Sequence, residues 1–274
     1  MSGAAAHAGQ AAAPSAPPLR RRKSVYALSP AQLDALRRAF AAVYRISDNR
    51  GYAFYAGMHG VPGQFCRHHE PPSQLPLFLP WHRAYLYVFE RALRDQVREA
   101  SLPWWDWTTP SAHQNGIPQT YAAARAGGKR NPLAAGPIMP LAQGRRAAPL
   151  TERQPGPPSE LPEATAVQTL LSVRDFQRFS SRLQDIHDSV HGWVGGHMGI
   201  IAWASYDPIF WAHHAMVDRI WALWQLQNRP VFPPEYLNQA LPPFPFTVAQ
   251  TLNIKNLGYD YAASTTHVVV GGGH

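Results

Sequence analysis

Apolar residues recur at intervals of three and four in four segments of the chain, and this spacing predicts four amphipathic helices. The first begins at Ser29 and ends near Arg45. Ser29 is a typical N-cap residue, and Pro30 after it suits the first position of a helix. The other three are predicted over residues 81–100, 175–193 and 207–227. The pattern therefore predicts a mainly α protein built on an antiparallel four-helix bundle.

The segments between and after these helices lack a regular pattern. Residues 116–162 are rich in Pro, Gly and Ala, which is typical of a long irregular stretch. Beyond residue 229 the chain is rich in Pro, and only residues 246–248 and 268–270 read as short strands. We therefore expect long loops and a few short strands around the bundle.

The first residues have a different composition from the rest. Residues 1–18 are mostly Ala, Pro, Gly and Ser, and a basic run follows at residues 20–23. Such a segment buries too little apolar surface to become ordered, so we expect a disordered basic tail over residues 1–24 and one folded domain over residues 25–274. The basic run precedes an amphipathic rather than an apolar segment, unlike a signal peptide. A cytoplasmic location is expected, and export together with a partner protein stays open.

Charge and hydropathy together argue against two classes of partner, nucleic acid and membranes. The chain has 25 Lys+Arg and 17 Asp+Glu, a net charge of +8, and 15% charged residues. It has no run of about 18 apolar residues that could span a bilayer. Ten of the basic residues lie at residues 20–23 and 125–153, in predicted loops without interleaved aromatic residues, which indicates a solvated basic surface. We expect neither a nucleic-acid nor a membrane partner.

Histidine is the residue type that points to chemistry. The single cysteine, Cys66, cannot form an internal disulfide, so a metal site must be built from other ligands. Of the 13 histidines, nine fall in two groups along the chain. The first group is His59, His68, His69 and His82, and the second is His187, His191, His197, His213 and His214.

The histidine spacing predicts a metal centre. His187 and His191 are four apart, so both rings lie on one helix face. His213 and His214 lie within an apolar helix, where a buried imidazole without a partner is costly. Imidazole ligands suit copper, zinc, iron or nickel, and two triplets imply two ions. A zinc hydrolase would normally add a carboxylate ligand, and the HExxH motif is absent.

Four segments, in the same order along the chain, resemble the central domain of tyrosinases, catechol oxidases and related polyphenol oxidases, the type 3 copper proteins, and of these the short bacterial tyrosinases. They read LPLFLPWHRAYLYVFERALRD, LPWWDWT, DIHDSVHGWVGGHMG and SYDPIFWAHHAMVDRIWALWQ. The later LGYDY resembles the tyrosine motif that ends this domain in the family. The resemblance covers residues 25–261 and implies a bundle that holds a dicopper centre, with two copper ions per chain.

The resemblance also implies the ligands. CuA would be held by His59, His68 and His82, and CuB by His187, His191 and His214. In the family the second histidine of the DPIFxxHH motif is the ligand, which selects His214 over His213.

The assignment of His68 depends on Cys66. The family usually places this ligand nine residues before the PWHR histidine, where this chain has Ser73, so the segment carries an insertion. Several relatives have a Cys-x-His sequence whose cysteine is joined to the ligand by a thioether. CRH at residues 66–68 fits that pattern and favours His68 over His69. The alternative for Cys66 is a small buried apolar residue.

The implied activity is oxidation of o-diphenols to o-quinones by O2. Relatives that also hydroxylate monophenols, a monooxygenase activity, have an Asn after the first CuB histidine and an upstream Glu, which together orient a water. Here the residue is Asp188, and residues 178–186 contain no Glu. Asp188 either holds a water, acts as a base or is a solvated surface acid. We expect oxidation of o-diphenols, and of o-aminophenols, to be faster than tyrosine hydroxylation.

Other positions are predicted to shape the site. Ile201 stands where some relatives place a bulky residue that gates access to CuB. Because Ile is of intermediate size, it should leave access open. The alternative is that Ile201 is an ordinary core residue. Phe210, one turn before His214, should cover the site. Asp218 and Arg219 should fix the same helix by ion pairing or by orienting an imidazole.

Three alternatives share parts of this pattern. A hemocyanin-like oxygen carrier would use the same dicopper site without turnover. A zinc-pair hydrolase lacks its carboxylate ligand here, and a non-catalytic scaffold would not need six ligands. Oxygen carriers cover the site with another domain, and none follows by residue 274, so an enzyme is favoured. The expected partners are O2 and a small phenolic substrate, and a copper-delivery protein stays open.

Overall fold

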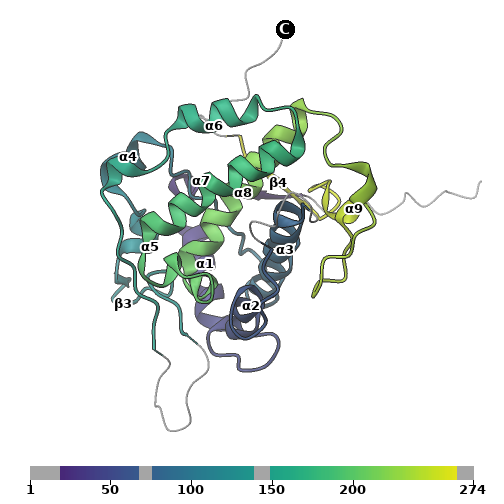
Figure 1. The fold of residues 1–274 in the computed structure, drawn as a ribbon. Coiled ribbons are helices and arrows are strands. Elements are labelled where there is room, and N and C mark those ends of the chain that lie inside the picture. Colours follow the sequence, from purple (N-terminus) through teal and green to yellow (C-terminus); the bar gives the residue numbers. More distant parts are fainter. Residues whose placement is uncertain (1–18, 68–75, 139–148, 264–274) are drawn as a thin grey trace, which may run out of the picture.

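The computed structural model describes residues 19–67, 76–138 and 149–263, which form a mainly helical protein (Figure 1). The longer helices are α1 (Pro30–Val43), α2 (Tyr52–His59), α3 (Phe78–Gln96), α6 (Ala164–Leu171), α7 (Phe176–Val194) and α8 (Pro208–Gln227). The short helices are α4 (Pro110–Asn115), α5 (Gln119–Ala122) and α9 (Val248–Thr251). The strands are β1 (Arg20–Arg22), β2 (Arg125–Ala126), β3 (Lys129–Arg130) and β4 (Tyr259–Tyr261).

The four predicted helices are confirmed as α1, α3, α7 and α8, and local capping explains where they begin. Ser29 and Gln32 form a capping box at the start of α1. The Asp175 side chain accepts from the Arg178 backbone N–H at the start of α7. Asp207 accepts from the Ile209 backbone N–H at the start of α8. The mainly α fold class is therefore confirmed.

Some expected elements differ. Helices α2 and α6 did not stand out in the apolar pattern because each has only eight residues. The strand expected at residues 246–248 is wrong, because Thr247 and Gln250 form a capping box that starts α9 at Val248. Within residues 116–162, the described part holds α5 and the antiparallel pair β2–β3. The strand expected at residues 268–270 lies outside the described residues.

Aromatic side chains fill the core between the long helices. Helix α3 packs against α1 and α8, and α6 packs against α7 and α8. The rings of Phe89 on α3 and Trp211 on α8 stack with centroids 3.7 Å apart. Phe179 on α7 and Trp224 on α8 stack at 4.6 Å. These contacts set the relative positions of the helices that carry the histidines.

The two ends of the described chain meet in a parallel pair. Strand β1 pairs with β4, with Arg22 opposite Tyr261. The Arg22 side chain is completely buried. The predicted end of the disordered tail at residue 24 is therefore wrong, because residues 20–24 are held in the fold by strand pairing and by the charge of Arg22. The same finding corrects the expectation of a solvated surface for Arg22, whereas Arg21 of the same run is exposed.

Arg22 belongs to a buried group of four charges, here called the ionic cluster: Arg22, Arg83, Glu90 and Asp218. The Arg22 guanidinium lies 3.0 Å from the Glu90 carboxylate and 3.4 Å from that of Asp218. Arg83 Nε donates to Asp218 Oδ1 at 2.5 Å. The cluster joins α3, α8 and β1 in the apolar interior.

Two tyrosines of β4 complete the surroundings of Asp218. The hydroxyls of Tyr259 and Tyr261 donate to Asp218 Oδ2 at 2.7 and 2.6 Å. Burial alone would raise the pKa of Asp218, but Arg83, Arg22 and the two hydroxyls hold that pKa below its ordinary value. The expected ion pairing of Asp218 is thus confirmed. Because Arg83 follows His82 and Asp218 lies one turn after His214, the cluster holds two histidine-bearing helices in register.

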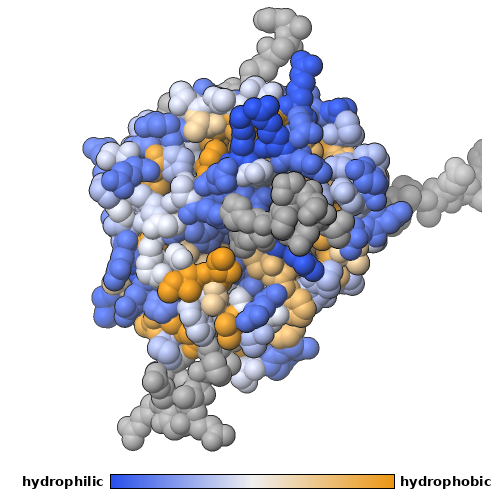
Figure 2. All heavy atoms as spheres, viewed as in Figure 1, coloured by the Kyte–Doolittle hydropathy of each residue, from blue (hydrophilic) through white to orange (hydrophobic). Residues whose placement is uncertain are grey.

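The outer surface mixes polar and apolar groups. Figure 2 shows a mostly hydrophilic face that is interrupted by smaller apolar patches. Among the described residues, no helix combines the length and the apolar character needed to cross a membrane.

The ionic cluster can be tested by removing one member. Arg22→Met should lower the free energy of unfolding by about 3–5 kcal/mol, because it removes the buried counter-charge of Glu90 and one of the two arginines that face Asp218. The measurement is urea denaturation of the full chain. Arg38→Met is the matched control, since Arg38 pairs with Asp34 at the surface and should cost about 0.5 kcal/mol or less. Equal losses in the two variants would contradict a special role for the cluster.

Candidate metal centre

Five of the six predicted ligands lie in the described residues, and the fold brings them to one place. His59 ends α2, His82 lies in the second turn of α3, His187 and His191 lie on α7, and His214 lies on α8. Ring nitrogens of His59, His82 and His214 lie within 4.8 Å of one another, as do those of His187, His191, His213 and His214. His68 lies outside the described residues, so its assignment stays a prediction.

Oxygen acceptors orient the imidazoles. His59 Nδ1 lies 3.2 Å from the Ile201 carbonyl oxygen, His82 Nδ1 2.8 Å from that of Phe78, and His191 Nδ1 2.8 Å from that of Met198. A carbonyl oxygen can only accept, so each Nδ1 carries the proton and each Nε2 presents a lone pair. This is the arrangement by which proteins prepare an imidazole for a metal ion.

His187 is oriented by a carboxylate. Its Nδ1 donates to Asp188 Oδ1 at 2.8 Å, which leaves Nε2 as the coordinating atom in the neutral ring. The side chain of Asp188 is 43% exposed, so the carboxylate reaches solvent while it holds the imidazole.

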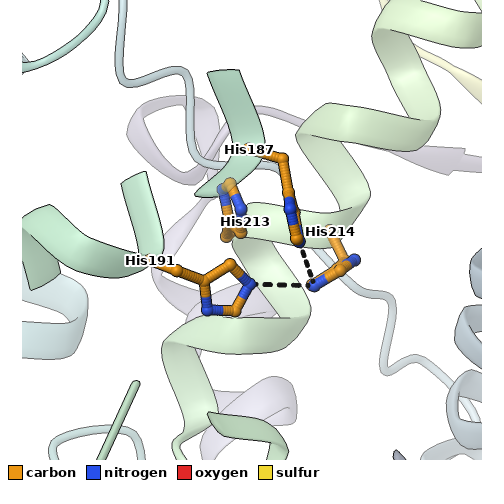
Figure 3. A group of neighbouring side chains, drawn as sticks. All are labelled: His187, His191, His213 and His214. Atoms are coloured by element: carbon orange, nitrogen blue, oxygen red, sulfur yellow. Dashed lines mark hydrogen bonds between the residues drawn. The ribbon is translucent and has the colours of Figure 1, made fainter. Parts of the chain in front are cut away.

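The Nε2 atoms converge on one another. His214 Nε2 lies 3.1 Å from His187 Nε2 and 3.3 Å from His191 Nε2, as Figure 3 shows. Two nitrogens bound to one ion at about 2.0 Å are about 3.3 Å apart in tetrahedral geometry. Nitrogen lone pairs that face one another repel. A single N–H on His214 Nε2 could not form good hydrogen bonds to both His187 and His191. A metal cation at their meeting point would satisfy all three, so these residues fit a bound ion.

Burial keeps the candidate ligands neutral. Desolvation lowers the pKa of His82 to about 3. Desolvation, reinforced by neighbouring imidazoles, also lowers the pKa of His59 and His214 well below the ordinary value. A metal ion therefore need not displace protons from these rings at neutral pH.

His213 is not a predicted ligand, but it lies beside the candidate ligands. Its ring stacks on that of His187 with centroids 5.0 Å apart, and it is completely buried. Its two ring nitrogens lack a hydrogen-bond partner of good geometry in the described residues. The nearest Nε2 neighbours of His187 and His191 nevertheless belong to His214, which supports the choice of His214 as the ligand.

Cys66 lies beside the same cluster. Its Sγ is 3.6 Å from His82 Nε2, and the side chain packs against the core while staying partly exposed. The thioether expected between Cys66 and His68 involves a residue outside the described part of the chain, so it stays a prediction.

A cavity of about 250 Å³ opens onto the histidines. Its walls are His59, His187, Asp188, His191, Gly192, Met198, Gly199, Ile201 and Ala204. Ile201 is 61% exposed at this cavity, so it is not a core residue. Phe210 does not line it. Its ring packs 4.0 Å from that of His214 and 4.8 Å from that of His59, and so encloses the imidazoles from within the core.

Several parts of the site have no signature in the sequence. The carbonyl oxygens of Phe78, Met198 and Ile201 orient three imidazoles, but every residue has a carbonyl, so no residue type marks this role. The Phe78 ring also contacts His82 and His187, with centroids 4.7 and 5.0 Å away. Glu90 was detectable, as a charged residue among apolar neighbours of a predicted helix.

Comparison with known proteins agrees with this geometry. Residues 49–227 match the family model described as the common central domain of tyrosinase. The tyrosinase of Streptomyces glaucescens is 31% identical over 223 residues, which are 71% of this chain and 80% of that protein. Hemocyanin units G and H of Sepia officinalis are 31% identical over 226 residues, which are 74% of this chain but only 37% of that protein.

Solved structures show the same fold. A functional unit of octopus hemocyanin aligns with a TM-score of 0.71 and 26% identity, and the alignment covers 89% of this chain and 68% of that one. The tyrosinase of Burkholderia thailandensis aligns with a TM-score of 0.76 and 23% identity, over 92% of this chain and 75% of that one. Because the family model spans more than half of the chain, the protein belongs to the tyrosinase family of type 3 dicopper proteins.

Proposed function

We propose that the chain binds two copper ions, CuA through His59, His68 and His82 and CuB through His187, His191 and His214. The support for CuB is the convergence of three Nε2 atoms at spacings that suit one ion. The support for CuA is the grouping of His59 and His82 and the oxygen acceptors that hold both Nδ1 atoms. Membership of a dicopper family favours copper over the other metals that imidazole binds.

We further propose that the chain is a copper oxidoreductase that oxidises o-diphenols to o-quinones with O2. The observation that carries this proposal is the open cavity whose walls include His59, His187 and His191. Its volume of about 250 Å³ lies just below the range of pockets for drug-sized ligands, which suits a single aromatic ring. An oxygen carrier needs no such space for an organic substrate.

The reaction requires two electrons and two protons to leave each diphenol. When bound, the copper pair would supply the redox chemistry that couples this loss to O2 reduction, so that two diphenols and one O2 give two quinones and two waters. The chain itself orients the ring and accepts protons. Among the described residues, Asp188 is the only carboxylate in the cavity wall, and we assign to it the acceptance of the phenol proton.

The cavity wall also governs access. The exposed Ile201 offers an apolar surface to an entering ring, and Gly192, Gly199 and Ala204 leave space beside the histidines. Phe210 and Phe78 pack against the imidazoles on the core side and exclude water there. Among the described residues, the cavity therefore offers the substrate its approach to the histidines.

An oxygen carrier is the second candidate, because hemocyanin units are as similar to this chain as the tyrosinases are. The chain covers 37% of the Sepia protein, so the activity of the whole relative is not transferred to it. Delivery of copper by a partner protein and a cytoplasmic location remain proposals that rest on the sequence.

Copper stoichiometry tests the ligand assignment. The full chain, saturated with copper and freed of excess, should hold about two copper ions by elemental analysis. His214→Ala should hold fewer, because the Nε2 atom shared by the cluster is lost, whereas His213→Gln should still hold two. Loss of copper in His213→Gln but not in His214→Ala would reverse the assignment. Circular dichroism of both variants checks that they are folded.

Substrate rates test the proposed activity. O2 uptake by the copper-loaded chain should be faster with catechol, L-DOPA and o-aminophenol than with tyrosine, because Asp188 replaces the Asn of efficient hydroxylases and the upstream Glu is missing. Equal rates on tyrosine and L-DOPA would refute this ranking. Reversible O2 binding without turnover of any phenol would identify an oxygen carrier instead.

Asp188 offers a test of how His187 is held. Asp188→Ala should weaken copper binding by about 10–100-fold, because the Nδ1 atom of His187 loses its acceptor. Asp188→Asn keeps a side-chain oxygen at that position and should retain most of the affinity. Competition with a copper chelator measures both. Equal affinity of the Ala variant and the unaltered chain would show that Asp188 does not position the ligand.

A further inference from the structure

A second cavity, of about 730 Å³, lies at the other end of α8 from the histidines and is here called the α8 cavity. It is enclosed by residues 219–231, which include the C-terminal part of α8, and by residues 252–263. It shares no lining residue with the histidine cavity. The proposed oxidase activity therefore gives it no role.

One part of the α8 cavity is apolar. Leu223, Leu226, Leu252 and Ile254 contribute to its wall. Leu226 is 73% exposed and lines this cavity. Apolar walls with a few polar groups are typical of sites that bind small organic molecules.

The polar part of the wall is mainly cationic. Among the described residues it contains Arg219, Arg229 and Lys255 but only one acid, Asp260. Lys255 Nζ lies 3.9 Å from Asp260 Oδ2, so these two charges offset each other. Arg229 donates Nη1 to the carbonyl oxygens of Gln225 and Asn228 and makes no ion pair among the described residues. Arg219 and Arg229 thus make no ion pair among the described residues.

Arg219 is the less expected of the two arginines. It is only 3% exposed, and its Nε and Nη1 have no acceptor among the described residues. Burial lowers the pKa of Arg219, and the more distant Asp106 offsets this only in part. The ion pair expected for Arg219 from the sequence is absent from the described residues, where its guanidinium lies 4.9 Å from the centre of the Trp104 ring. A buried guanidinium without an acceptor is costly, which favours a ligand that brings negative charge.

We propose that the α8 cavity binds an amphipathic anion, a small molecule with an apolar body and one carboxylate or phosphate group. The leucine side chains would cover the apolar body, and Arg219 and Arg229 would hold the anionic group. The volume lies within the range of about 300–1,000 Å³ found for small-molecule sites.

The α8 cavity lies next to the ionic cluster. Tyr261 lines the cavity and donates its hydroxyl to Asp218, and Arg219 follows Asp218 on α8. A ligand that binds the folded chain only would stabilise it by mass action. Occupancy should therefore raise the melting temperature whether or not copper is bound.

Laurate, a twelve-carbon carboxylate, is a suitable probe. Isothermal titration of the full chain, with and without copper, should show saturable binding of one laurate per chain. Dodecanol has the same chain without the charge and should bind at least about tenfold more weakly, because it forms no charge-assisted contacts. Added salt should weaken laurate binding more than dodecanol binding. Equal affinities for the two probes, or no saturable binding, would overturn the proposal.

Matched variants locate the site. Arg229→Gln should weaken laurate binding about tenfold, and Ala222→Phe should also weaken it by occupying part of the cavity. Arg178→Gln is the control, since Arg178 is an exposed arginine of α7 outside the cavity. Equal weakening by Arg178→Gln and Arg229→Gln would place the binding elsewhere and overturn the proposal. Retained dodecanol binding in Arg229→Gln shows that this variant is folded.

A shortened chain excludes another occupant. The chain that ends at Ala263 should bind laurate with the same affinity as the full chain. If laurate bound only to the shortened chain, the cavity would be a site for residues 264–274, and the proposal would be wrong. Failure of laurate to bind leaves copper stoichiometry and phenol oxidation untouched, so the two proposals fail independently.

Discussion

The structure depends on the cost of burying imidazoles whose Nε2 atoms face one another. Carbonyl oxygens hold Nδ1 of His59, His82 and His191, so these rings cannot turn to find other partners. Burial lowers the pKa of the rings and prevents protonation from relieving the contact. A cation between the Nε2 atoms removes the conflict. The centre is therefore prepared for a metal ion by its protein surroundings, and the ion in turn should stabilise the fold.

The remaining core keeps these rings in place. His82 and His214 lie on α3 and α8, which are joined by aromatic stacking and by the ionic cluster. A buried cluster of charges tolerates few alternative geometries, because each charge must meet its partners. This property suits a site in which ligands from separate helices must meet within tenths of an ångström. The terminal strands add to it, since Arg22 of β1 and the tyrosines of β4 reach the same Asp218 carboxylate.

Both tyrosinases and hemocyanins are similar to this chain, so what can reach the histidines matters for its function. In this chain the approach is a small cavity with an exposed Ile201 and a carboxylate, Asp188, that also orients His187. Those features support the oxidation of a small phenol. The α8 cavity lies at the other end of the same helix and differs in chemistry, with arginines and leucines in place of histidines. Helix α8 thus contributes to two sites that can be tested separately.

The sequence by itself determined the long helices, the mainly α class and the two histidine groups, because helix periodicity and capping are local properties that each segment carries alone. The tertiary structure decided the rest. It showed that Arg22 is buried, that Arg219 lacks an ion pair in the described part of the chain, and which carbonyl oxygens orient the imidazoles. These features arise between residues far apart in the chain, such as Arg22 and Tyr261, which lie opposite each other in the β1–β4 pair. No local pattern records such pairings, so only the folded chain reveals them.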